Sequence, residues 1–185
     1  MAKRASAALD LGLVRDLTLP HLDAAYNLAR WIIGTDEDAA DVVHTAFLRA
    51  ARYVHTYAGG NARAWWLSIV RNCCLATLGA RSKREVSLES LETDDPDFER
   101  RSDDSIEESL HLSQSAALIL KELQAIPVEY REVLVLRELE DCSYREIADI
   151  LSVPIGTVMS RLARARSLIR KALMETSGQG KRHEL

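Results

Sequence analysis

The cationic segment "PIGTVMSRLARAR", from Pro154 to Arg166, carries the residues best suited to a recognition chemistry. Between Ile150 and Met174 there are five basic residues and no Asp or Glu, although the 185-residue chain has a net charge of -4. Arginine can bond guanine edges bidentately or hold phosphates, and serine bonds bases or backbone. These residue types indicate a polyanionic partner such as DNA, with a merely solvated basic helix as the alternative.

Patterns typical of an enzyme or a metal site are missing from the sequence. It contains no phosphate-binding glycine loop and no Ser/His/Asp set, and its five histidines lie without ligand spacing. Cys73, Cys74 and Cys142 include an adjacent pair but no CxxC motif, so we expect structural or incidental roles. A redox or metal role for the pair is the alternative. We therefore predict a protein that is not an enzyme and holds neither cofactor nor metal.

Two helices joined by a short turn must position the cationic segment. The stretch "SYREIADIL" can form the first helix, because Ser143 can cap it with Glu146 three residues later. After Ser152-Val153, the segment from Pro154 continues as a second helix, which gives the outline of a helix-turn-helix. At about 100° per residue, the second helix has an apolar stripe for burial and a cationic face for solvent. The stripe comprises Val158, Leu162, Ala165, Ile169 and Ala172.

The rest of the chain is helical in pattern on both sides of an acidic segment. Apolar residues follow helical spacing before this segment and after it, and no strand pattern stands out. Between Glu85 and Leu110 there are eleven acids and two bases, which is typical of a flexible linker. We predict an all-α protein with two small helical domains joined by an acidic flexible linker. The divisions are an N-terminal extension at 1–17, a domain at 18–84, a linker at 85–112, a domain at 113–174 and a frayed tail at 175–185.

Capping residues predict where the helices of the first domain begin and end. Thr18 suits the N-cap of its first helix, and Gly34 suits the end of that helix. Thr35, with Asp38 three residues later, resembles a capping box for the second helix. No stretch approaches the ~18 apolar residues of a membrane-spanning helix, and acids interrupt the basic N-terminus before a signal-peptide core. We expect a cytoplasmic protein without membrane insertion.

Two motifs, in the expected order, resemble those of bacterial RNA polymerase sigma factors. The stretch "EYREVLVLRELEDCSYREIADILSVPIGTVMSRLARARSLIRKAL" resembles their region four. "DAADVVHTAFLRAAR" resembles the region-two helix that docks on the polymerase, and "ARAWWLSIVRN" resembles the next segment, which melts and reads promoter DNA. Two such domains with a short linker match the extracytoplasmic-function (ECF) subfamily.

The resemblance implies a promoter-specificity subunit that docks on RNA polymerase core through the beta-prime clamp helices and the beta flap. The positions that match the clamp-docking surface are Asp38, Asp41, His44, Thr45 and Arg49. His44 and Thr45 depart from the Gln and Glu usual in the family, so one carboxylate of that surface is lost.

The resemblance also assigns residues to two promoter elements. The positions matching the minus-ten element are Tyr57, Gly60, Asn61, Arg63, Arg71 and Asn72, with Arg81, Lys83 and Arg84 on backbone phosphates. Trp65 matches a family tryptophan that acts as a core anchor or a base stacker. The positions matching the minus-thirty-five element are Met159, Ser160, Ala163 and Arg164 facing bases, Arg161 and Arg166 on phosphate, and Tyr144 and Arg145 on backbone. Captured bases would offset the stacking that is lost on strand opening.

The resemblance also implies a protein partner, and two other functions stand as alternatives. Family membership implies an anti-sigma factor that masks the DNA-binding domains and could hold the chain at the membrane. The acidic linker is a candidate for holding the two basic domains closed in the free protein. A stand-alone helix-turn-helix regulator would not need the two N-terminal motifs. A helical bundle that sequesters another protein would leave the acid-free helix unexplained.

Overall fold

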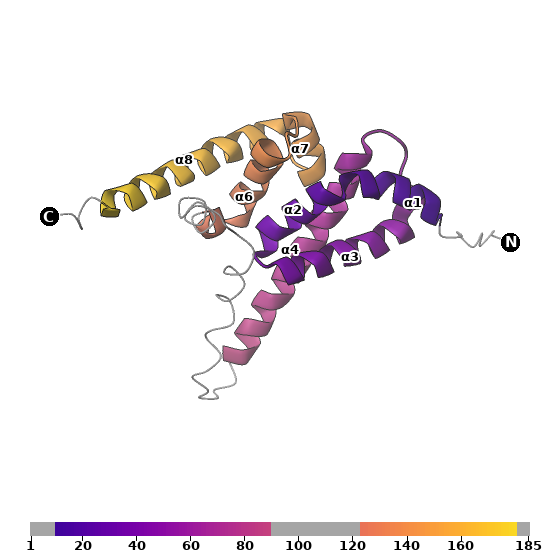
Figure 1. The fold of residues 1–185 in the computed structure, drawn as a ribbon, viewed down its shortest axis with the longest axis horizontal. Coiled ribbons are helices and arrows are strands. Elements are labelled where there is room, and N and C mark those ends of the chain that lie inside the picture. The colour runs from indigo at the N-terminus through magenta and orange to yellow at the C-terminus, as the bar shows by residue number, and fades with distance from the viewer. Residues whose placement is uncertain (1–9, 90–122, 181–185) are drawn as a thin grey trace.

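The computed structural model describes residues 10–89 and 123–180, and within these ranges every regular element is a helix. The all-α prediction is confirmed. Most of the predicted acidic linker lies outside the described residues. The prediction that this linker holds the two domains closed therefore also falls outside them. Figure 1 shows two groups of helices in contact, α1 to α4 in one and α6 to α8 in the other.

The two groups follow the order of the chain. The N-terminal group comprises α1 (Leu11–Thr18), η1 (Leu19–His21), α2 (Leu22–Ile33), α3 (Asp36–Tyr53), η2 (Val54–Thr56) and α4 (Ala62–Glu89). The C-terminal group comprises α6 (Val128–Leu134), a single π turn η4 (Val135–Leu139), α7 (Tyr144–Leu151) and α8 (Ile155–Gly180). Helix α6 starts directly after Pro127, which lacks the N–H that an interior helical position requires.

Helix α1 was not expected from the sequence. Asp10 caps it by accepting a hydrogen bond from the backbone N–H of Leu13 at 3.0 Å. Its buried side chains Val14 and Leu17 pack toward α3 and α4. Thr18 is the last residue of α1, and its hydroxyl donates a hydrogen bond to the carbonyl of Val14 at 2.8 Å. The prediction that Thr18 caps the next helix is wrong, because α2 begins only after a 3₁₀ turn.

The other predicted caps had mixed outcomes. Gly34 ends α2 with φ of 103°, a left-handed conformation that glycine adopts without strain, as predicted. Thr35 precedes α3, but its hydroxyl bonds to the Asp38 carboxylate rather than to the backbone, so the predicted capping box is wrong there. The box at α7 is confirmed, because both of its reciprocal hydrogen bonds are present.

Two helices run further than predicted. Helix α4 continues to Glu89, five residues into the predicted linker. Helix α8 continues to Gly180, beyond the predicted end of the second domain at residue 174. Residues 181–185 of the predicted frayed tail lie outside the described residues.

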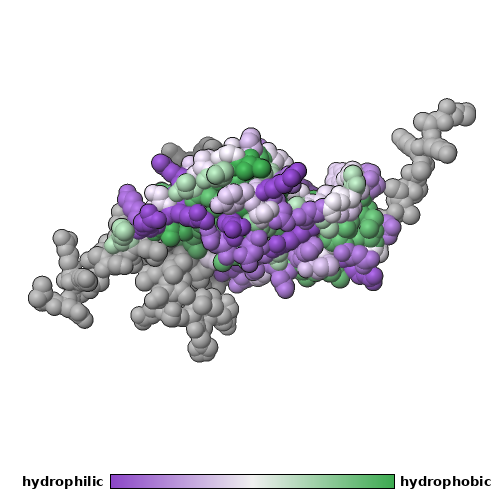
Figure 2. All heavy atoms as spheres, turned by 90° about the horizontal axis from the view of Figure 1, so that it is seen from above, coloured by the Kyte–Doolittle hydropathy of each residue, from purple (hydrophilic) through white to green (hydrophobic). Residues whose placement is uncertain are grey.

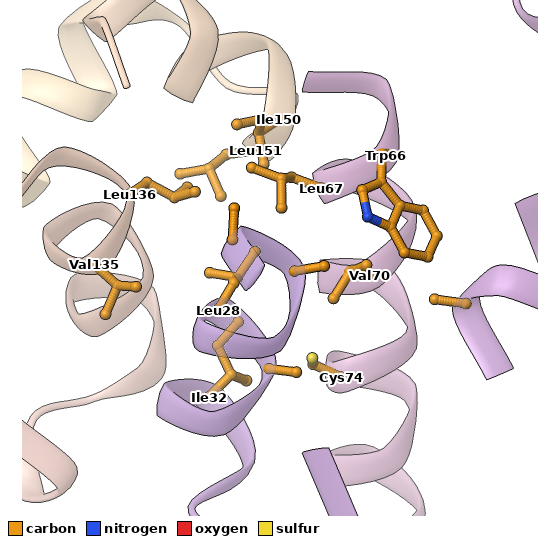
Figure 3. Close-up of a cluster of buried hydrophobic side chains, with 14 of the residues drawn as sticks. Leu28, Ile32, Trp66, Leu67, Val70, Cys74, Val135, Leu136, Ile150 and Leu151 are labelled. Carbon is orange, nitrogen blue, oxygen red and sulfur yellow. The ribbon is translucent and has the colours of Figure 1, made fainter. Parts of the chain in front are cut away.

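One hydrophobic core joins the two groups of helices (Figure 3). Leu28 of α2 and Leu67 of α4 lie close to Leu136 of η4 and to Ile150 and Leu151 of α7. These five side chains are at most 3% exposed. Full burial of an aliphatic side chain contributes about 1.5–3 kcal/mol. The two groups are therefore docked against each other through apolar packing.

One face of the molecule is largely polar. Figure 2 shows hydrophilic side chains over most of the face seen from above, with hydrophobic areas that are small and separate. Over residues 10–89 and 123–180, no helix is both long and apolar enough to cross a membrane.

Candidate nucleic-acid interface

A tight turn sets the angle between α7 and α8. Ser152 has φ of 54°, and this left-handed conformation ends α7. The N–H of Val153 then bonds to the carbonyl of Ala148 at 3.1 Å. Pro154 opens α8, and its carbonyl accepts from the N–H of Thr157 at 2.9 Å. The predicted helix-turn-helix is present.

Helix α8 has one buried and one exposed face, as predicted. Val158, Leu162 and Ala165 are at most 1% exposed and pack toward α6 and α7. On the other face Met159 is 54% exposed. The remaining predicted base-facing residues, Ser160, Ala163 and Arg164, are also exposed. A short side chain at 163 between longer ones leaves room for a groove wall to approach. Contact of this face with the minus-thirty-five element stays a prediction.

The residues predicted to meet the minus-thirty-five backbone lie around this face. Arg166 pairs with Glu138 at 2.7 Å, and both side chains are 49% exposed, so the pair is weak and can exchange for a phosphate. Arg145 is exposed at the start of α7. Tyr144 is half-buried, and the guanidinium of Arg137 lies 5.3 Å from the centre of its ring.

The loop before α4 has a defined shape. The Tyr57 hydroxyl donates to the carbonyl of Gly60 at 2.7 Å, and the Tyr57 ring lies 5.4 Å from that of Trp65, tilted by 55°. Gly60 has φ of 97°, which a side chain would oppose. The Asn61 side-chain oxygen accepts from the N–H of Ala64 at 3.0 Å and caps α4. Trp65 packs against the core, in agreement with the anchor reading, and also against Tyr57.

Two predicted minus-ten residues bond to carboxylates of the other helical group. The side-chain amide of Asn61 donates to Glu146 at 2.7 Å. Arg63 pairs with Glu140 at 2.9 Å, and the Glu140 side chain is only 7% exposed. Glu140 also accepts from the side-chain amide of Asn27 at 3.1 Å, so both of these bonds come from the N-terminal group.

A third predicted minus-ten residue, Arg71, binds Glu132, whose carboxylate is the most deeply buried among the residues that the structure describes. Its Nε and Nη2 atoms lie 2.7 and 3.0 Å from the two carboxylate oxygens of Glu132, which is 1% exposed. Arg161 of α8 approaches the same carboxylate at 3.3 Å and is 26% exposed. Glu132 therefore holds one arginine from α4 and one from the recognition helix. Arg161 was predicted to meet phosphate, and here it bonds within the protein.

The remaining predicted minus-ten residues lie further along α4. Asn72, Lys83 and Arg84 are exposed. Arg81 pairs with Asp38 at 2.6 Å, and this joins a predicted phosphate contact to a predicted polymerase contact. The hydrogen bond from Thr35, followed by that from Arg81, lowers the pKa of Asp38 below its ordinary value.

The predicted polymerase-docking residues share one side of α3. Four of them, Asp41, His44, Thr45 and Arg49, are exposed. His44 also lines an open, mostly apolar groove of about 530 Å³ between α2 and α3. Leu22 and Phe47 supply apolar surface to this groove, and Leu22 is 42% exposed.

Sequence reasoning did not find the buried acids Glu132 and Glu140. A signal for Glu132 was present, because it stands next to a run of apolar residues that are now buried, Val133 to Leu136. A charged residue in such a run is expected to have a partner. The neighbouring Arg131 is likewise held inside, by the carbonyls of Trp31, Gln124 and Ile126, and burial lowers its pKa.

The three cysteines are buried and free. Burial raises the pKa of Cys74 to about 12 and that of Cys142 to about 11, so both thiols stay protonated near neutral pH. Among the described residues no group of three or more His, Cys, Asp or Glu is placed to hold a metal ion.

The described residues form two groups of helices, and the second group contains a helix-turn-helix with an exposed, basic recognition face. This arrangement is typical of a DNA-binding protein. Two family models match the chain, sigma-70 region 2 over residues 17–84 and sigma-70 region 4 over residues 116–169. The chain belongs to the sigma-70 family of RNA polymerase sigma factors, in its ECF group.

Relatives agree with this placement. The ECF RNA polymerase sigma factor SigE of Mycolicibacterium smegmatis is 32% identical over 164 residues, which cover 89% of this chain and 63% of that protein. The RNA polymerase sigma-H factor of Pseudomonas aeruginosa is 34% identical over 142 residues, 74% of each chain. The fold is shared with the sigma factor RpoE of Bartonella quintana, solved in complex with the anti-sigma factor NepR. That comparison has a TM-score of 0.69 at 22% identity and covers 86% of this chain and 98% of the other.

Proposed function

We propose that this chain binds core RNA polymerase, directs it to a defined set of promoters and helps to open the DNA strands. The observation that carries the proposal is the pairing of two surfaces in one chain. One is the exposed side of α3 beside an apolar groove, and the other is the exposed face of α8 between Ile155 and Met174, a stretch without Asp or Glu. A regulator that acted on DNA alone would need only the second surface.

The recognition face of α8 reads the minus-thirty-five element in the major groove. Ser160 and Arg164 supply hydrogen bonds to base edges, while Met159 and the small Ala163 supply apolar contact. Arg166, Tyr144 and Arg145 hold the flanking phosphates and so fix the register of the helix. Arg161 can bind a phosphate as well only if its ion pair with Glu132 breaks.

The loop and first turns of α4 capture the minus-ten element. Tyr57, Gly60 and Asn61 form a rigid loop that can accept an unstacked base, with Arg63, Arg71 and Asn72 as polar partners. Arg81, Lys83 and Arg84 meet the backbone further along the helix. Opening is driven by binding energy, and the chain catalyses no reaction.

The polymerase contact lies on α3, with Asp38, Asp41, His44, Thr45 and Arg49 facing the beta-prime clamp helices. The C-terminal group faces the beta flap. We further propose an anti-sigma partner in the cytoplasm, because a relative in fold was solved with one. Such a partner could also hold the chain at the membrane.

The test combines binding and transcription. Purified bacterial core polymerase should be retained by the tagged chain, and run-off transcription from a genomic promoter library should give a defined set of starts. A charge-reversed α3 variant, Asp41→Arg, should lose core binding while keeping the helical content of the wild type. Failure of the wild-type chain to bind core, together with footprints of the chain alone on duplex DNA, would refute the proposal.

A further inference from the structure

The arginines of α8 that were assigned to DNA differ in whether the protein itself already binds them. Arg161 pairs with Glu132 at 3.3 Å, and Arg166 pairs with Glu138 at 2.7 Å. Arg164 is exposed, and among the described residues its side chain has neither an ion pair nor a hydrogen bond. The two arginines assigned to phosphate are therefore paired with acids, whereas the arginine assigned to bases is free.

Both acids belong to the same helical group as α8. Glu132 lies in α6 and Glu138 in the turn η4 that follows it, and α6 packs against α8 (Figure 1). Arg166 approaches one oxygen of Glu138 with Nε at 3.2 Å and with Nη2 at 2.7 Å. The pairing of these acids with α8 is thus internal to the C-terminal group and needs no contact with α1 to α4.

The carboxylate of Glu138 takes up donors that a phosphate would use. Carboxylate and phosphate oxygens both accept hydrogen bonds from an edge of a guanidinium group. Glu138 also offsets the charge of Arg166, so that this arginine displaces fewer counterions from DNA. The pair is weak enough to be exchanged, because both side chains are 49% exposed. It therefore lowers the attraction of α8 to a duplex of any sequence without preventing binding.

Base contacts decide when this pair is exchanged. On a matched minus-thirty-five element, the bonds of Arg164 to base edges hold α8 in one register, so a phosphate stays beside Arg166 and can replace Glu138. On a duplex of unrelated sequence no base contact fixes the register. A loosely held phosphate then competes poorly with a carboxylate that is always adjacent. Glu138 consequently weakens binding to unrelated DNA more than binding to the matched element, and this raises the ratio of the two affinities.

We propose that Glu138 is a specificity-determining residue, which suppresses the binding of α8 to DNA of unrelated sequence by occupying Arg166. It is a positioning residue, because it acts on DNA only through that arginine. Glu132 holds Arg161 in the same way at a more buried site. This inference rests on the proposed function, since it assumes that α8 reads the minus-thirty-five element.

Glu138→Gln tests the proposal with little risk to the fold. Among the described residues, the side chain of Glu138 bonds only to Arg166, and it is half-exposed. The variant keeps the size of the side chain and removes its charge. Asp149→Asn, at an exposed position of α7, is the matched control for the loss of one carboxylate from the same helical group. Arg166→Ala removes the partner through which Glu138 acts.

The measurement is equilibrium binding of reconstituted holoenzyme to two fluorescein-labelled duplexes over a series of salt concentrations. One duplex carries the minus-thirty-five element of a promoter found by run-off transcription, without its minus-ten element, and in the other duplex that element is scrambled. E138Q should bind the scrambled duplex about three- to fivefold more tightly than wild type, and the matched duplex less than about twofold more tightly. Its salt slope on the scrambled duplex should become steeper by about one. D149N should change both affinities equally, by less than about twofold.

A double-mutant cycle assigns the effect to the ion pair. In the R166A background, E138Q should change the affinity for the scrambled duplex no more than D149N does. Equal effects of E138Q and D149N, or an effect of E138Q that persists without Arg166, would overturn this inference alone, provided that run-off transcription is normal. Loss of core binding by E138Q would place Glu138 on the polymerase-docking surface and would overturn it as well. If wild-type holoenzyme gives no run-off transcription, the proposed function itself fails, and this inference fails with it.

Discussion

The bond between Arg71 and Glu132 gives the sharpest test of the interface. The change is Arg71→Ala, which removes both hydrogen bonds to a carboxylate that is 1% exposed. Loss of one partner of a buried ion pair costs about 3–5 kcal/mol, because the other charge stays buried without compensation. Here Arg161 remains at 3.3 Å from Glu132 and water can fill part of the vacated site, so we expect about 2–3 kcal/mol.

Urea unfolding followed by the helical circular dichroism signal measures this loss. The control is Arg52→Ala, at an exposed position of α3, which should stay within about 0.5 kcal/mol of wild type. A double-mutant cycle with Glu132→Gln isolates the pair, and the loss from R71A should shrink by about 1–2 kcal/mol in that background. If R71A unfolds like R52A, or loses the same stability in both backgrounds, the contact is not formed in solution.

Three further predictions use other parts of the molecule. Hydrogen bonds from Ser143, chiefly the one from its backbone N–H, lower the pKa of Glu146. The stabilising contribution of ionised Glu146 is therefore complete above its ordinary pKa of about 4.3, and it is lost as the pH falls through the lowered pKa. Glu146→Gln should therefore flatten the acid side of the stability profile, and an unchanged slope would contradict this. Since burial raises the pKa values of Cys74 and Cys142, native protein at pH 8 should react far more slowly with a disulfide reagent than urea-unfolded protein, and equal rates would count against their burial. Arg164→Ala should cost about 1–3 kcal/mol of binding at a matched promoter and less on random duplex, whereas equal losses would make it a phosphate contact.

Much of the local structure follows from the sequence. The capping box at Ser143, the left-handed Gly34 and the apolar stripe of α8 each depend on residues within a few positions of one another. Such signals were sufficient to predict the helix-turn-helix and its exposed face. Helix α1 was missed because its buried side chains, Val14 and Leu17, are too few to give a clear period before Thr18.

The interface could not be predicted in the same way. Arg71 and Glu132 are 61 positions apart, and their pairing depends on how two helical groups dock rather than on any local pattern. The charge pattern suggested that acids might close the protein, but it drew attention to the linker. The acids that bond across the interface are instead single carboxylates in helical or turn positions, where each looks like an ordinary surface residue.

The π turn at Val135–Leu139 determines on which side of the chain the two buried acids lie. On a regular α-helix, residues 132 and 140 would differ by about 80° around the axis, because eight residues complete two turns and a fraction. The wider turn accommodates one extra residue and sets later positions back by roughly one residue's rotation, about 100°. Glu132 and Glu140 are thereby brought onto nearly the same side. A protein of otherwise similar sequence that lacked one residue in this turn would keep both groups of helices and both acids. The two carboxylates would then point to different sides of the helix. A single-residue length difference in this turn would therefore distinguish chains whose C-terminal group can pair with both Arg63 and Arg71 from chains in which it can pair with only one of them.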